Sequence, residues 1–84
     1  LSELAVRHEF KEEIEKLIKG DVELFKITFK AMYSQNVKAR FVSRIIITML
    51  MENKDFQKTF RDKYIHLSDE LYIFEKQQEW KYNG

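Results

Sequence analysis

The chain has 84 residues, enough for one domain, and its 44% hydrophobic content is too high for a disordered segment. It has no cysteine and a formal net charge of +1, which exclude disulfides, thiolate zinc sites and a strong global attraction to nucleic acid or membranes. Proline is absent and only two glycines occur, a composition typical of an all-α protein. We therefore predict a small four-helix bundle that forms a single helical domain over residues 1–84.

The first predicted helix runs from about Glu3 to Lys19. Ser2 is a suitable N-cap, and Gly20 stands where a left-handed C-terminal cap is expected. Asp21 can then cap a second helix, which carries an aromatic stripe and ends at the polar residues 34–36. The apolar face of the first helix consists of Val6, Phe10, Ile14, Leu17 and Ile18.

The third predicted helix covers about Val37 to Glu52. Its segment 41–51 reads FVSRIIITMLM, with no charged residue after Arg44. A helix that is apolar on all sides has to be covered by other helices or by a partner. We therefore expect this third helix to be the central helix of the bundle.

The remaining segment, from Asp55 onwards, carries a heptad-like apolar seam. The seam passes through Ser68 without interruption, which favours one long fourth helix. However, Ser68 followed by Asp69 and Glu70 also has the pattern of a new N-cap, and a break near His66 would give five helices. The seam consists of Phe60, Tyr64, Leu67, Leu71, Phe74 and Gln78.

The distal part of this tail also has apolar residues off the seam, among them Ile73 and Tyr82. A continuous helix would expose them, and exposed apolar patches usually mark protein contacts. If the helix breaks, the same aromatics close the core instead. We predict a helical interaction or regulatory module that binds a protein partner or forms a homodimer. The predicted partner-binding residues are Leu71, Tyr72, Phe74, Trp80, Arg40 and Arg44.

A cationic group marks the start of the third predicted helix. Lys38, Arg40 and Arg44 lie near its N-terminus, where the helix dipole is unfavourable for cations, and Arg40 repels Arg44 four residues on. The three residues are a candidate anion-binding site for a phosphate or an acidic partner surface. The alternative is pairing with the glutamates of the first helix or with Glu52.

Two further functions stay open. Residues 38–63 hold 7 of the 15 basic residues, with a local excess of +4, which would suit a nucleic-acid-associated regulator. The short helices and dense aromatics from Asp21 to Ile65 would also suit a ligand-sensing helical domain of a larger transcriptional regulator.

The sequence offers no chemistry-bearing motif. His8 and His66 are isolated, and thiol nucleophiles, glycine-rich phosphate loops and zincin patterns are absent. We therefore expect no enzyme activity, no cofactor and no metal. The N-terminus lacks a signal pattern and no apolar run approaches a membrane span, so we expect a cytoplasmic protein without membrane contact. Starting at Leu1 rather than Met is consistent with a fragment of a longer protein.

Overall fold

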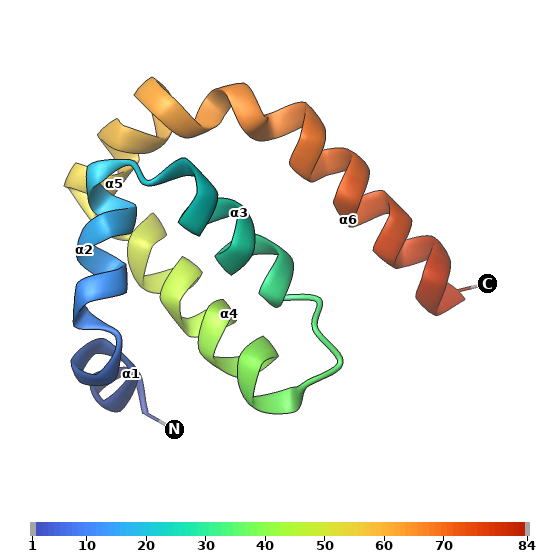
Figure 1. Ribbon diagram of the computed structural model, residues 1–84, viewed down its shortest axis with the longest axis horizontal. Coiled ribbons are helices and arrows are strands. Elements are labelled where there is room, and N and C mark those ends of the chain that lie inside the picture. Colours follow the sequence, from blue (N-terminus) through green and yellow to red (C-terminus); the bar gives the residue numbers. More distant parts are fainter. Residues whose placement is uncertain (1, 84) are drawn as a thin grey trace.

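The computed structural model describes residues 2–83 of the chain and the side chains of residues 2–81. A π-helical turn (Phe60–Tyr64) and a 3₁₀ turn (Ile65–Leu67) join the last two helices, and no strand occurs in residues 2–83. The predicted all-α small bundle is therefore confirmed (Figure 1). The helices are α1 (Glu3–Glu9), α2 (Lys11–Lys19), α3 (Val22–Ala31), α4 (Val37–Met51), α5 (Lys54–Thr59) and α6 (Ser68–Asn83).

The first predicted helix is interrupted at Phe10, so the prediction of one helix from Glu3 to Lys19 was wrong. Phe10 has φ −108° and ψ 27°, outside the helical region, and α2 begins at the next residue. The bend lets α1 and α2 both contact α4, with Val6 and Leu17 each 0% exposed. Burial of these two apolar side chains thus stabilises the break at Phe10, although no proline or glycine in the sequence indicates it.

The C-terminus of α2 ends in the predicted glycine cap. Gly20 has φ 102°, a left-handed conformation in which a side chain would be strained. The Asp21 and Gly20 N–H groups both donate to the Lys16 carbonyl, each at 3.1 Å. A Cβ at position 20 would also collide with Cδ of Lys63, so the cap is packed against the turn that follows α5.

Two side chains from the distant end of the chain complete this cap. Thr59 Oγ1 donates to the Ile18 carbonyl at 2.6 Å, and the Tyr64 hydroxyl donates to the Leu17 carbonyl at 2.7 Å. Carbonyls in the last turn of a helix have no partner within that helix, so such donors stabilise its end. These two bonds fix α5 and the π-helical turn against α2.

An aromatic cluster centred on Phe25 of α3 fills the core. Its ring stacks on Tyr64, with centroids 4.1 Å apart and an interplanar angle of 13°. Phe29, Phe56 and Phe60 each lie with ring centroids 6.1 to 6.4 Å from Phe25. Offset and edge-on aromatic pairs add stabilisation beyond the apolar area that they bury.

The helix α4 is central, as predicted, and contacts α1, α2, α3 and α5. The Asn36 side chain caps it by accepting a hydrogen bond from the Ala39 N–H at 3.0 Å. The side of α4 that faces the bundle is buried, but the opposite side is not. Its buried apolar residues are Val42, Ile46, Met49 and Leu50.

The tail from α5 to α6 is helical throughout but bends sharply over the two irregular turns (Figure 1). The π-helical turn has more residues per turn than an α-helix, and the 3₁₀ turn has fewer. The two changes oppose each other, so the predicted seam stays on the inner side of the bend. Ser68 opens α6 in a helical conformation, with φ −57° and ψ −41°. The break near His66 is thus a bend in the axis. All seam residues from Phe60 to Gln78 are buried or half-buried.

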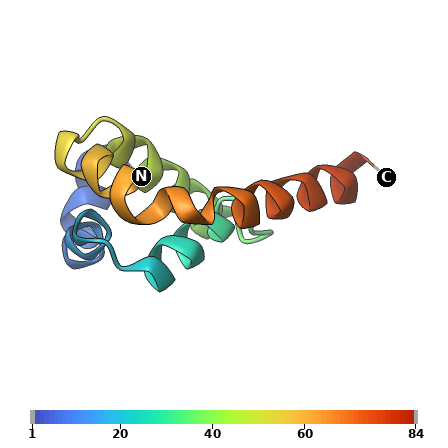
Figure 2. The ribbon, with the colours of Figure 1, turned by 90° about the horizontal axis from the view of Figure 1, so that it is seen from above.

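Beyond this bend α6 runs away from the bundle, and its distal part extends past the other helices (Figure 2). It still contacts α3: Phe74 lies under Lys30 Nζ at 5.5 Å, and Glu70 lies 3.5 Å from Lys26 Nζ. Phe74 also packs edge-on against Tyr33, just after α3, at 5.6 Å. Within residues 2–83, no helix is long and apolar enough to cross a bilayer.

Candidate functional site

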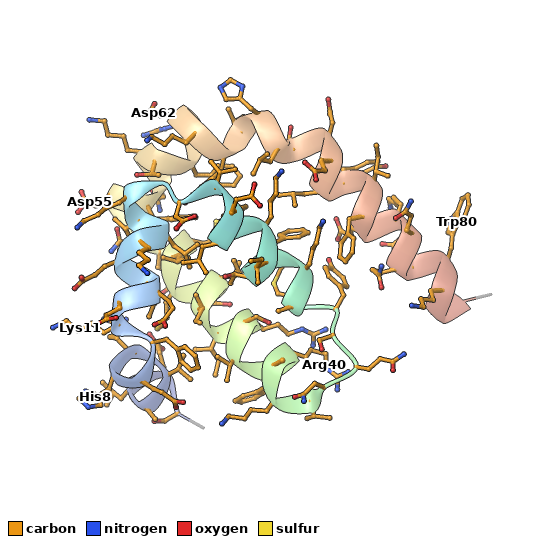
Figure 3. The ribbon with its side chains drawn as sticks, in the orientation of Figure 1. His8, Lys11, Arg40, Asp55, Asp62 and Trp80 are labelled. Atoms are coloured by element: carbon orange, nitrogen blue, oxygen red, sulfur yellow. The ribbon has the colours of Figure 1, made fainter. Side chains whose placement is uncertain are left out.

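Large hydrophobic side chains that remain exposed gather on two helices. Among the residues whose side chains the structure describes, nine are of this kind, and α4 and α6 contribute three each. Trp80 is 79% exposed and points away from the bundle (Figure 3). The six are Val37, Phe41 and Met51 on α4 and Tyr72, Ile73 and Trp80 on α6.

Five of the six exposed residues of α4 form one line along the helix, which we call the α4 stripe; the sixth, Lys38, lies next to Val37. Their spacings of 4, 3, 4 and 3 residues place them on one face, opposite the buried one. One member of the stripe, Arg44, carries a charge, and with Lys38 beside the line three of the six exposed residues of α4 are large and apolar. The α4 stripe consists of Val37, Phe41, Arg44, Thr48 and Met51.

A second line of exposed residues follows the outer side of α6, and we call it the α6 stripe. Here too the spacing is helical, and every member is exposed. Lys76 lies within it, with Nζ 5.4 Å from the Tyr72 ring and 3.2 Å from an oxygen of Glu79. That hydrogen bond to Glu79 is the main cause of the raised pKa of Lys76. The α6 stripe consists of Asp69, Tyr72, Ile73, Lys76 and Trp80.

The two stripes meet at the root of α6. A groove of about 260 Å³ lies there, lined by Met51 of the α4 stripe and Tyr72 of the α6 stripe together with Ile47 and Phe29. Away from this groove, α3 lies between α4 and α6 (Figure 1).

The predicted partner-binding residues fall into two groups. Leu71 is buried (6% exposed), and Phe74 is half-buried against Tyr33, so both belong to the bundle. Tyr72 and Trp80 are exposed and lie on the α6 stripe. The side chain of Tyr82 lies outside the described residues.

Sequence reasoning missed the apolar residues of the α4 stripe. Val37, Phe41 and Met51 belong to a helix that looked apolar all round, so their pattern alone does not separate the buried face from the exposed one. The available signal was Arg44, because a charged residue marks the solvent side and these three lie at helical spacing from it.

The three cations of α4 do not converge on one point. Lys38 lines a groove against α2 and α3, whereas Arg44 lines a small groove with Glu3 and Glu52. Arg40 donates to the Ser34 carbonyl at 3.5 Å. Among the described side chains, none of the three cations lies within 4.0 Å of a carboxylate, so the ion pairs that the sequence left open do not form.

Opposite charges lie on α4 and α6. The helix α4 has three cations and no acid, whereas α6 has four acids and two lysines, a net charge of −2. Tyr33 lies between them: burial raises its pKa first, the nearby Glu75 raises it further, and Arg44 acts in the opposite direction. The charges of Arg44 on α4 and Glu75 on α6 therefore act on the pKa of the same phenol in opposite directions.

Another groove, with a volume of about 440 Å³, lies between α2, α3 and α4. Its two buried hydroxyls are satisfied, because Thr28 donates to the Leu24 carbonyl and Ser43 to the Ala39 carbonyl. The surface that is left is almost entirely apolar and of a size that small ligands occupy. Its main apolar lining residues are Phe10, Leu17, Leu24, Ile27, Val42 and Ile46.

The basic residues of segment 38–63 are divided between two ends of the molecule. Arg40 lies at one end of the bundle. Asp55 and Asp62, which lie among the basic residues of segment 54–63, are at the opposite end (Figure 3). The fold therefore does not join this segment into the single basic patch that a nucleic-acid binder usually presents.

Within residues 2–83, no group of three or more metal-ligating side chains lies close enough together to hold a metal ion. No protein-family model matches this chain, and no curated protein or solved structure is significantly similar to it.

Proposed function

We propose that this chain is a small helical protein-interaction module with a regulatory role, and that it docks its partner on the α4 and α6 stripes. The observation that carries this proposal is that six of the nine exposed large hydrophobic side chains among the described residues lie on these two helices. A folded chain rarely exposes a contiguous apolar patch without a partner to cover it. Aromatic residues, Met and Arg, which make up half of the ten residues of these stripes, are also enriched in protein interfaces.

The two stripes are well suited to helix-on-helix docking. The buried face of α4 holds its exposed face rigid, so Phe41 is presented without a loss of backbone freedom on binding. Trp80 and Tyr72 can fill pockets of a partner as anchors, while Arg44 sets its orientation by charge.

Removal of the two aromatic anchors tests the proposal. The double variant Phe41→Ser/Trp80→Ser should keep its fold, because both side chains are exposed, but should bind less of a dye that fluoresces on apolar surfaces. Dye fluorescence in dilute solution measures this surface, and far-ultraviolet circular dichroism checks the fold. Leu4→Ser is the matched control, because Leu4 is as exposed as Trp80 (79%) but lies on α1, off both stripes.

A strictly monomeric wild-type chain that binds no dye would contradict the proposal. Equal dye loss in Leu4→Ser and in the double variant would also contradict it, because the apolar surface would then not be concentrated on α4 and α6.

The groove between α2, α3 and α4 supports a second candidate, a ligand-sensing domain for an apolar molecule. Its volume of about 440 Å³ is within the range of small-molecule sites. Lys38 at its rim can pair with an anionic head group, which favours an apolar carboxylic acid over a neutral hydrocarbon.

A medium-chain fatty acid is the probe for this candidate. Because a ligand that binds only the folded state raises its stability, the thermal unfolding midpoint of the wild type should rise with fatty-acid concentration. In Ala31→Phe the new ring occupies the groove, so the midpoint should not respond. A wild-type midpoint that does not change, or an equal rise in both proteins, would remove the ligand-sensing candidate.

A further inference from the structure

We propose that the partner of this docking surface is a second copy of the chain, with the α6 stripe of each copy lying along the α4 stripe of the other. This inference rests on the proposed function and identifies the partner that covers the two stripes. A twofold axis would make the two contacts identical, as in most homodimers.

Charge complementarity is the first argument. Among the exposed side chains, α4 carries two cations, Lys38 and Arg44, a net charge of +2, whereas α6 carries three acids and two lysines, a net charge of −1. Pairing α4 with α4 would bring Arg40 and Arg44 of both copies together, whereas pairing α4 with α6 brings opposite charges together. Repulsion between like charges disfavours the α4–α4 pairing as much as attraction between opposite charges favours the α4–α6 pairing. The charges therefore favour a contact between α4 of one copy and α6 of the other.

The dimensions of the stripes agree with this pairing. At 1.5 Å per residue, the α4 stripe from Val37 to Met51 is about 21 Å long, and the α6 stripe from Asp69 to Trp80 is about 17 Å long. The α6 stripe therefore fits within the length of the α4 stripe. Both repeat at spacings of 3 and 4 residues, which lets the side chains of one helix pack between those of the other.

Within one copy α3 lies between α4 and α6 and contacts both, so a second copy would approach α4 and α6 from their exposed sides (Figure 1). The distal part of α6 extends beyond the bundle (Figure 2). In the dimer, α6 of one copy lies beside α4 of the other, and the twofold axis repeats the contact. Each distal α6, including Trp80, then gains the cover that its own bundle does not give.

Two charge-reversal variants test the pairing. In Arg40→Glu/Arg44→Glu, α4 becomes acidic and repels α6 of the other copy. In Asp69→Lys/Glu79→Lys, α6 becomes basic and repels α4. Each variant alone should dimerise at least about tenfold more weakly than the wild type. Mixed in equal amounts, they should form a heterodimer with both contacts attractive, and affinity should return to within about threefold of the wild type. Sedimentation equilibrium measures all four dissociation constants, those of the wild type, the two variants and the heterodimer.

Controls separate this effect from a change in folding or in net charge. Lys11→Glu/Lys16→Glu changes the net charge as much as the α4 reversal but lies on α2, far from α6 (Figure 3), and should dimerise like the wild type. Circular dichroism confirms that each variant is helical. If a reversal unfolds the chain, the milder Arg44→Gln and Glu79→Gln replace it, and each must still weaken the dimer.

The outcomes distinguish this inference from the function on which it rests. If the wild type is monomeric but its stripes bind dye, the partner is not a second copy, and the proposal of an interaction module is unaffected. A monomeric wild type that binds no dye overturns both. A wild-type dimer that neither reversal weakens, or weak dimers without recovery on mixing, would show that α4 does not pair with α6 of the other copy.

Discussion

Tyr64→Ala is expected to lower the free energy of unfolding by about 3–5 kcal/mol, enough to leave a chain of this size largely unfolded. Tyr64 is 0% exposed and stacks on Phe25 at 4.1 Å, so its removal leaves a cavity at the centre of the aromatic cluster. It also removes the hydroxyl that binds the end of α2. Urea unfolding followed by circular dichroism measures the loss, and a cost below about 1 kcal/mol would contradict this role.

Tyr64→Phe keeps the ring and isolates the hydroxyl. Its cost should be only about 0.5–1.5 kcal/mol, because the Leu17 carbonyl still accepts from the Gly20 N–H at 3.2 Å.

The same variant also changes the dependence of stability on pH. Burial, and then the charge of Asp21, raise the pKa of Tyr64 from 10.0 to about 12. The unfolded chain therefore loses this proton at lower pH than the folded one. The contribution of Tyr64 is present below pH 10 and is lost as the pH rises towards 12. Tyr64→Phe should lose less stability over this range, and an equal loss in both proteins would contradict the assignment.

Leu50→Ala is expected to lower the free energy of unfolding by about 2–5 kcal/mol, whereas Met51→Ala should cost about 1 kcal/mol or less. The two residues are neighbours on α4, but Leu50 is 1% exposed and Met51 is 46% exposed. The comparison therefore measures directly whether α4 has one buried and one exposed side. Urea unfolding of both variants checks it, and similar costs would show that the α4 stripe is covered within the monomer.

Much of the fold follows from short stretches of sequence. Ser2 and Asp21 accept hydrogen bonds from backbone N–H groups three residues on, and Gly20 takes the left-handed conformation. Such caps depend only on neighbouring residues, so the sequence predicts them. The seam from Phe60 to Gln78 is equally local, because residues three and four apart share a helix face whether or not its axis bends.

The bends could not be predicted because distant residues set them. The break at Phe10 depends on how α1 and α2 both pack on α4. The bend after α5 accompanies the hydrogen bonds from Thr59 to Ile18 and from Tyr64 to Leu17, which join residues 41 and 47 positions apart. No local pattern encodes contacts of that separation.

The candidate surface was only partly predictable for the same reason. Tyr72 and Trp80 lie off the seam at helical spacing, which identified them from sequence. Whether Leu71 and Phe74 are covered depends on the bend, and the structure places both against the bundle. The exposure of Phe41 depends on which side of α4 the other helices cover.

The fluorescence of Trp80, the one tryptophan of the chain, gives the clearest test of the proposed docking surface. Its indole is 79% exposed in the single copy, so it should emit as a water-exposed tryptophan in dilute solution. With increasing protein concentration the emission should shift to shorter wavelength in the wild type but not in Arg40→Glu/Arg44→Glu. Emission that stays at the water-exposed wavelength at concentrations where the wild type is dimeric would contradict a contact through α4 and α6.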